Sequence, residues 1–202
     1  MSPCRVVTAP IVLSRAEQLR HDCRGVGAVE FALILPLMLL MFFGTIDISE
    51  GFAAKRKVSQ IAQTVSDLTS RNTAVSDTDI TNFFIIADAM LTPYDKSQLK
   101  ATITQVYLDP SSKTAKTVWS RGDEKKNKND VVSVPDALIT KDTSGNWLPD
   151  QYLIVGAVKY GYVPVIGWVV AKGGLTLSQT AYTKPRQVTC VMLGTTCTPA
   201  GG

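Results

Sequence analysis

The sequence has a single histidine, His21, and only four cysteines among its 202 residues. One imidazole gives little material for a histidine base with a distant partner or for a multi-histidine metal site, so most familiar enzyme classes are disfavoured. The sequence also has no phosphate-cradling glycine motif and no G-x-S-x-G elbow. The carboxylates of Asp136, Asp142 and Asp150 are interpreted as solvated loop side chains. We therefore predict no catalytic residues, no metal site and no cofactor.

The chain also lacks a region in which charge of one sign dominates. Its 21 lysines and arginines are interleaved with 17 aspartates and glutamates, and the formal net charge is only +4. Nucleic-acid-binding surfaces gather basic residues on one face or in one run, so a nucleic-acid partner is not expected. The length favours one domain with an appendage.

Hydrophobic residues, in contrast, are concentrated in one place. From Phe31 to Phe43 only Pro36 is not apolar, and extension to Val26 and Ile46 gives a segment that spans about 31 Å as a helix, one bilayer crossing. Its large apolar side chains favour insertion by about 3 to 6 kcal/mol. A charge at the bilayer centre costs about 2.5 to 3.5 kcal/mol, and Glu30 lies near the end of the segment, where the cost is smaller. We predict a transmembrane helix over residues 26–46, with a kink at Pro36.

The flanking charges favour a cytoplasmic N-terminus. Four arginines precede the segment, whereas Asp47 and Glu50 follow it, although the cluster Lys55-Arg56-Lys57 on the far side weakens this asymmetry. That cluster is interpreted as a solvated helix face, with contact to lipid headgroups as the alternative. A cleaved secretory signal is the alternative for the segment as a whole. It is disfavoured by the acidic Glu30 and by the helical pattern that follows without a break.

The run Arg24-Gly25-Val26-Gly27-Ala28-Val29-Glu30-Phe31-Ala32-Leu33, followed by Leu35-Pro36, Gly44 and Asp47, resembles the TadE-like (TadE/TadG) pseudopilins of the Flp pilus, or tight-adherence, assembly system. The resemblance covers residues 24 to 66, about a fifth of the chain. It implies a bacterial inner-membrane protein with a single transmembrane helix and a periplasmic C-terminal domain. The partners that it implies are the inner membrane, a prepilin peptidase, other pilins or pseudopilins, and pilus assembly proteins.

The resemblance also implies roles for individual residues. Prepilin peptidases cut after a glycine, and a glutamate stands fifth in the mature chain; Gly25 and Glu30 have this spacing. Cleavage after Gly25 would make Val26 the mature N-terminus and remove a cytoplasmic leader, residues 1–25. Glu30, followed by the aromatic Phe31, would pair with the free ammonium group of a neighbouring subunit, since a carboxylate inside a bilayer needs a partner. The alternative is that Glu30 extends to the headgroups.

The remaining chain, residues 47–202, predicts an α+β fold: the long N-terminal transmembrane helix continues into a periplasmic pilin-like domain with a small antiparallel sheet. An apolar stripe predicts that the helix continues to about Ser70. A capping signal at Ser76–Asp79 predicts a second helix before Pro93. Strand and turn signals predict a hairpin over 99–120, a strand from Tyr152 to Ile166 broken by Pro164, and a strand over 175–182.

The cysteines fall on the two sides of the predicted membrane segment. Cys4 and Cys23 precede it, whereas Cys190 and Cys197 lie near the C-terminus. In a periplasmic domain the distal pair forms a disulfide, while a cytoplasmic pair stays reduced. We predict the disulfide Cys190–Cys197.

Three hypotheses follow from the sequence. The first is a non-enzymatic pseudopilin that acts by packing in pilus assembly after cleavage at Gly25. The second is an uncleaved, membrane-anchored scaffold or binding module of the TadG-like kind, and the third is a secreted enzyme whose N-terminus is only a signal. The first accounts best for the order of residues around Glu30.

Overall fold

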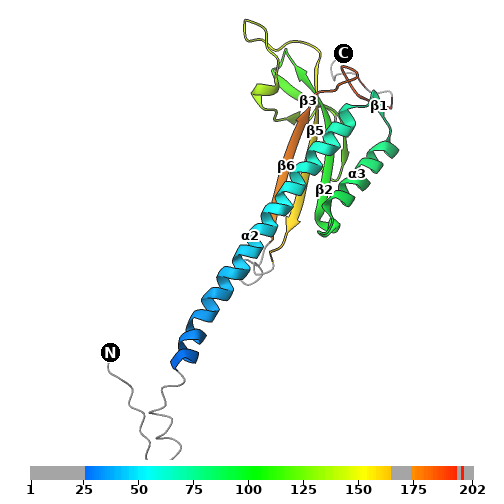
Figure 1. The fold of residues 1–202 in the computed structure, drawn as a ribbon. Helices are drawn as coiled ribbons and strands as arrows, with labels where there is room; N and C mark the ends of the chain where they lie inside the picture. Colours follow the sequence, from blue (N-terminus) through cyan, green and yellow to red (C-terminus); the bar gives the residue numbers. More distant parts are fainter. Residues whose placement is uncertain (1–25, 165–173, 195–196, 198–202) are drawn as a thin grey trace, which may run out of the picture. The chain divides into compact units, whose positions relative to one another are not determined.

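The computed structural model describes residues 26–164, 174–194 and 197 (Figure 1). Its first described element is helix α2, Val26–Ser70, a single run of 45 residues that continues through Pro36. The helix ends at Ser70, as the apolar stripe predicts. The chain divides into two compact units within this helix, one up to Asp47 and one from Ile48 onward.

A second helix, α3 (Asp77–Leu91), forms where the capping signal predicts it. The hydroxyl group of Ser76 accepts a hydrogen bond from the backbone N–H of Asp79 (3.1 Å), and the Asp79 carboxylate accepts one from the backbone N–H of Ser76 (2.9 Å). This reciprocal capping box satisfies two donors that a helix N-terminus otherwise leaves unpaired. The hydrogen bonds from Ser76 also lower the pKa of the Asp79 carboxyl group below its usual value. A short 3-10 helix, η2 (Lys96–Gln98), leads from α3 into the sheet.

Five of the described strands form a sheet in the order β4-β3-β2-β5-β6, in which every neighbouring pair is antiparallel (Figure 1). The predicted fold class, α+β with an antiparallel sheet, is therefore confirmed. Most of the sheet follows the strand signals, but the strand predicted to reach Ile166 ends earlier, and Val165 and Ile166 lie outside the described residues. The strands are β2 (Leu99–Asp109), β3 (Thr114–Gly122), β4 (Val131–Val132), β5 (Gln151–Tyr162) and β6 (Leu175–Thr183).

The turn between β2 and β3 is organised by Asp109. Its carboxylate accepts hydrogen bonds from the backbone N–H of Ser111 (2.9 Å), from the hydroxyl group of Ser112 (2.8 Å) and from the ammonium group of Lys116 (2.7 Å). The hydrogen bond from Lys116, followed by that from Ser112, holds the pKa of the Asp109 carboxyl group well below its usual range. The turn that the sequence predicts after Leu108 is thus confirmed, and the ion pair between Asp109 and Lys116 stabilises it.

A two-stranded parallel pair lies outside the main sheet. It joins β1 (Ala74–Val75), which follows α2, to β7 (Met192–Leu193) near the end of the described chain. Each strand has only two residues, so no periodic pattern in the sequence predicts the pair.

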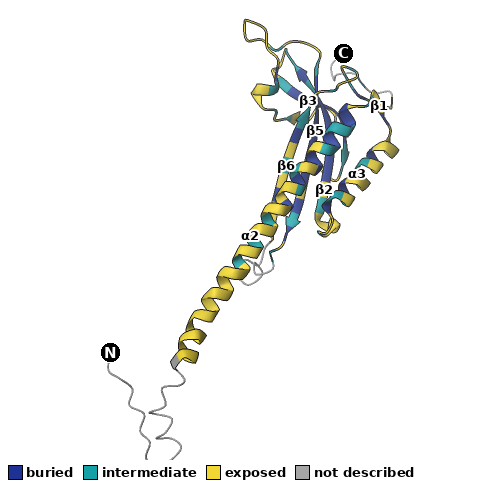
Figure 2. Ribbon diagram, in the orientation of Figure 1, coloured by how far each residue is buried: buried dark blue, intermediate teal, exposed yellow. Residues whose placement is uncertain are grey.

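The larger core lies between the helices and one face of the sheet. Figure 2 shows that the buried residues of α2 lie in its second half, which runs along the sheet. Along α2 the buried apolar positions recur every three to four residues, with Ile61 and Ala62 adjacent, as an apolar helix face requires. These residues are Ala54, Val58, Ile61, Ala62 and Val65, and they pack with Ile103, Ile154, Val158, Tyr160, Leu177 and Ala181 of the sheet. A smaller cluster on the other sheet face includes Val106, Leu108, Leu153 and Val155 under Ile139.

Candidate membrane and assembly site

The first half of α2 exposes its apolar side chains on every side. Every large apolar residue from Val29 to Ile46 is exposed, and Leu33 retains 76% of its surface. Figure 2 shows the same pattern along the ribbon. A helix that is hydrophobic all round is normally buried in a core or in a membrane. The structure has one helix that is long and apolar enough to cross a membrane, and none of its most apolar window is buried within the chain, as far as the described residues show.

The predicted site residues at the start of this helix fall partly within the described chain. Gly25 lies outside it, and Val26 is the first helical residue. Glu30 and Phe31 lie on the first turns and are exposed. No cation among the described residues is within ion-pairing distance of Glu30; the six ion pairs recorded there involve other carboxylates. The pairing of Glu30 with another subunit therefore stays a prediction.

Pro36 lies inside α2, and the helix is continuous on both sides of it. Proline lacks the N–H that would bond to the carbonyl group of Ala32, so one helical hydrogen bond is missing there. The kink predicted at this position stays a prediction.

The second half of α2 is held closely against β5. A Cβ atom placed on Gly156 would lie 2.7 Å from the carbonyl oxygen of Ala62 and 3.0 Å from Cβ of Ser66. Glycine is therefore what allows the helix backbone to approach the strand so closely. The hydroxyl group of Ser66 then reaches the carbonyl oxygen of Ile154 (3.3 Å), and that of Thr183 donates to the carbonyl oxygen of Ser66 (3.1 Å).

An ion-pair group fixes the end of the helix. Asp67 contacts both Arg71 and Arg186, the latter at 2.8 Å, and the backbone N–H of Arg186 donates to the carbonyl oxygen of Ser70 (2.9 Å). The segment that follows β6 is thereby tied to the C-terminal turn of α2.

Lys57 has a structural role that the sequence did not reveal. Its ammonium group donates to the carbonyl oxygens of Met90 (3.1 Å) and Thr92 (2.6 Å) at the end of α3. A cation at a helix C-terminus satisfies carbonyl groups that have no helical partner and interacts favourably with the helix dipole. The interpretation of the cluster Lys55-Arg56-Lys57 as a solvated face is therefore wrong for Lys57. Lys55 and Arg56 are exposed, which fits both a solvated face and contact with lipid headgroups.

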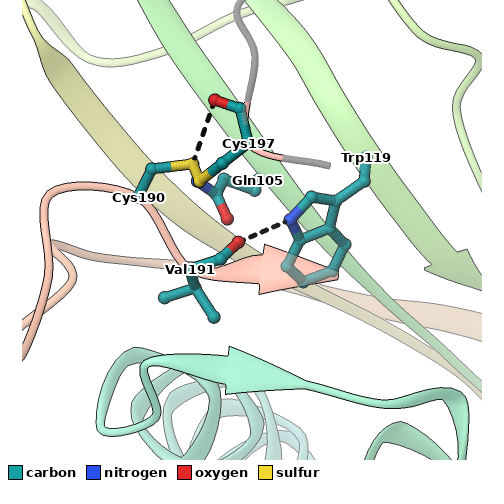
Figure 3. Close-up of a disulfide and its surroundings, with 5 residues drawn as sticks. All are labelled: Gln105, Trp119, Cys190, Val191 and Cys197. Atoms are coloured by element: carbon teal, nitrogen blue, oxygen red, sulfur yellow. Dashed lines mark hydrogen bonds between the residues drawn. A yellow bond between two sulfur atoms is a disulfide. The ribbon is translucent and has the colours of Figure 1, made fainter. Parts of the chain in front are cut away.

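A disulfide joins Cys190 and Cys197, whose Cα atoms are 6.1 Å apart (Figure 3). Its surroundings are buried and polar. The side-chain amide of Gln105, on β2, donates to Sγ of Cys190 at 2.8 Å, and the indole N–H of Trp119, on β3, donates to the carbonyl oxygen of Val191 at 3.0 Å. The disulfide closes a loop within the C-terminal segment, and the two hydrogen bonds connect this segment to β2 and β3.

Two of the three loop carboxylates, those of Asp136 and Asp142, have partners within the fold. Asp136 forms an ion pair with Lys141, and Asp142 accepts hydrogen bonds from the backbone N–H groups of Ser144 and Asn146, both at 2.8 Å. The bond from Asn146 is the largest cause of a lowered pKa for the Asp142 carboxyl group. Asp150 directly precedes β5. Across residues 26–164, 174–194 and 197, no group of three or more histidine, cysteine, aspartate or glutamate side chains could hold a metal ion.

The sequence alone did not identify Gly156, Lys57 and Arg186, the residues that hold the second half of α2 against the rest of the domain. A glycine in a strand pattern does signal close backbone approach. The partners of the two cations are distant in sequence, and no local pattern identifies them.

Comparison with known families gives one result. Residues 25–67 match the family model described as TadE-like protein, which covers about a fifth of the chain. The resemblance predicted from the residues around Glu30 is confirmed over this segment. No curated protein and no solved structure matches the chain.

Proposed function

We propose that this chain is a pseudopilin-like assembly protein of the Flp, or tight-adherence, pilus, anchored in the bacterial inner membrane by residues 26–46. The observation that carries the proposal is the TadE-like match, because it begins at Gly25 and includes the whole exposed apolar segment of α2. A TadE-like segment indicates a role in pilus assembly, and families of this kind are structural and not known as enzymes. The protein acts by packing against other subunits.

The membrane anchor follows from the exposure of the segment. If all large apolar side chains from Val29 to Ile46 stayed in water, the chain would present a continuous hydrophobic cylinder, which soluble monomers do not tolerate. A bilayer removes that surface from water, and the helix satisfies its own backbone hydrogen bonds except at Pro36. The N-terminus lies in the cytoplasm and residues 47–202 form the periplasmic domain, where the disulfide Cys190–Cys197 is chemically stable.

Processing and subunit pairing complete the proposal. A prepilin peptidase cuts after Gly25, so that Val26 carries a free ammonium group. In the assembled state this group on one subunit pairs with Glu30 of another, which compensates a carboxylate that would otherwise stand alone in the bilayer. The exposed position of Glu30 on the first turns of α2 leaves it accessible to a neighbour.

The test compares two isosteric substitutions on the same helix. Glu30→Gln removes the pairing charge, whereas Glu50→Gln removes another exposed carboxylate beyond the membrane segment. In a host strain that lacks the native gene, we expect pili and subunit association to be lost with Glu30→Gln and retained with Glu50→Gln. Normal pili and normal association with Glu30→Gln would show that the charge has no pairing role. Normal pili in the strain that lacks the gene entirely would refute the assembly function.

A further inference from the structure

A groove lies beside α2 just beyond the proposed membrane segment. Its volume is about 590 Å³, and its lining includes Phe52, Lys55, Arg56 and Ser59 of α2 and Gln179 of β6. Phe52 is 68% exposed, so the groove combines an apolar wall with two cations and polar side chains.

The same end of the domain exposes further apolar side chains. Ile48, Val163 and Leu175 are 63%, 66% and 59% exposed. A Cβ atom on Gly51 would touch the ring of Tyr162 at 3.5 Å, and one on Gly174 would lie 3.1 Å from the Val163 side chain. These contacts place the end of β5 beside α2, and the start of β6 beside the end of β5. Four large apolar residues, counting Phe52, therefore lie at this end of the domain.

The two cations of the groove have no internal function in the described structure. Neither Lys55 nor Arg56 forms an ion pair with any residue described, whereas the adjacent Lys57 caps α3. Positive charge just beyond the outer end of a transmembrane helix opposes the usual orientation rule. An anionic partner at that level would explain why the two charges are present.

We propose that this groove, lined by Phe52, Lys55, Arg56 and Gln179, binds the headgroup of an anionic phospholipid in the membrane leaflet where α2 emerges. The inference rests on the proposed membrane anchor. Lys55 follows Ile46 by nine residues, a rise of about 14 Å along the helix. The headgroup layer accounts for roughly 5 to 8 Å of that distance on each side of the hydrocarbon core.

The direction of side chains on a helix accounts for the remaining distance between Lys55 and the headgroup layer. Side chains on an α-helix lean toward its N-terminus, and here that direction is toward the bilayer. Long basic side chains can extend in this way while their aliphatic stems cover apolar surface, such as that of Phe52. The guanidinium group of Arg56 fits a phosphate with two parallel hydrogen bonds, and Lys55 adds a second charge.

The experiment uses the full chain in vesicles of 80% phosphatidylcholine and 20% phosphatidylglycerol. In parallel preparations one lipid or the other carries a photoactivatable headgroup, and crosslinked peptides are mapped by mass spectrometry. We expect crosslinks at residues 48–59 to favour phosphatidylglycerol at least about fivefold over its mole fraction, the factor that one cation near an anionic surface supplies. Lys55→Gln with Arg56→Gln should bring the ratio close to one.

The matched control is Lys113→Gln with Lys128→Gln. It removes the same charge from two exposed residues without ion pairs, one of them in the turn at the far end of β2. This variant should retain the full lipid preference. An equal ratio in the wild type and the Lys55/Arg56 variant would overturn the proposal, and so would crosslinks at the groove that join only two copies of the chain.

A second measurement, extraction with alkaline carbonate, tests the membrane anchor separately from the headgroup site. If alkaline carbonate extracts the chain from the vesicles, the membrane function is wrong and the headgroup site falls with it. If the chain resists extraction but shows no lipid preference, only the headgroup site is refuted.

Discussion

Replacing Gly156 by alanine tests how α2 is held to the sheet. The added Cβ atom would lie 2.7 Å from the carbonyl oxygen of Ala62, which belongs to the helix backbone and has no rotamer with which to avoid the contact. If α2 moved away, it would weaken the hydrogen bond from Ser66 to Ile154 and the one from Thr183 to Ser66. The clash therefore cannot be relieved without loss elsewhere.

The expected magnitude follows from two opposing effects. Overpacking of a closely fitted core costs about 1 to 3 kcal/mol. Removal of the conformational freedom of a strand glycine returns about 0.5 to 1 kcal/mol. The difference between the two effects is about 0 to 2.5 kcal/mol. Because the 2.7 Å contact is to a backbone atom, we expect a net loss of about 1 to 2 kcal/mol for Gly156→Ala, which lowers Tm by roughly 2 to 8 °C in a chain of this size. Thermal unfolding of the detergent-solubilised full chain, followed by tryptophan fluorescence, measures it, since Trp119 is buried beside this core.

Gly51→Ala is the matched control. Its Cβ atom would meet the ring of Tyr162 at 3.5 Å, an ordinary van der Waals distance, and alanine is the better helix former. This variant should be more stable by about 0.5 to 1 kcal/mol. If Gly156→Ala is as stable as the wild type, the close approach of α2 to β5 and the reasoning built on it are refuted.

Three further substitutions test other contacts by the same unfolding assay. Lys57→Met should lose about 1 to 2 kcal/mol because the end of α3 loses its cationic cap, whereas Lys55→Met should change stability little; equal losses would contradict the capping role. Replacing both Cys190 and Cys197 by serine should cost about 2 to 3 kcal/mol for a loop of this length, and a loss below about 0.5 kcal/mol would show that the disulfide does not stabilise the fold. Asp109→Asn should lose about 1 kcal/mol at pH 7. The folded pKa of this carboxyl group is lowered, so its contribution is present above the unfolded pKa and fades as pH falls below about 4. A deficit that stays constant down to pH 2 would contradict this assignment.

Elements that are specified locally could be predicted from the sequence. The capping box at Ser76 and the turn at Asp109 depend on residues within a few positions of one another, and the end of α2 at Ser70 follows from the apolar stripe that precedes it in sequence. The TadE-like segment belongs to the same class, because its signal is the order of residues from Gly25 to Asp47.

The rest depends on contacts between distant parts of the chain. Phe52 continues the apolar stripe of α2 in sequence, yet it is exposed, because the sheet covers only the side of the helix that carries Ala54 and Val58. The parallel pair of β1 and β7 joins residues more than a hundred positions apart. Neither the sheet's position against a helix nor such a distant pairing is encoded in a local period.

The candidate site also has parts that could be predicted from the sequence and a part that could not. The apolar segment and Glu30 were found from the sequence, since length, hydropathy and spacing suffice for them. The groove beside Phe52 was not, because it forms only where α2 and Gln179 of β6 come together.

The N-terminal sequence of the protein recovered from membranes of its native host tests the central claim most directly. The account predicts a chain that starts at Val26, which would identify Gly25 as the processing site and give Glu30 a free ammonium group as its partner. A Gly25→Val variant should then keep its leader, whereas Gly27→Ala, whose added Cβ atom meets open space, should be processed normally. A start at Met1 or Ser2 would contradict processing and leave an uncleaved membrane-anchored assembly factor, and a soluble chain that starts after about residue 53 would contradict the membrane anchor itself.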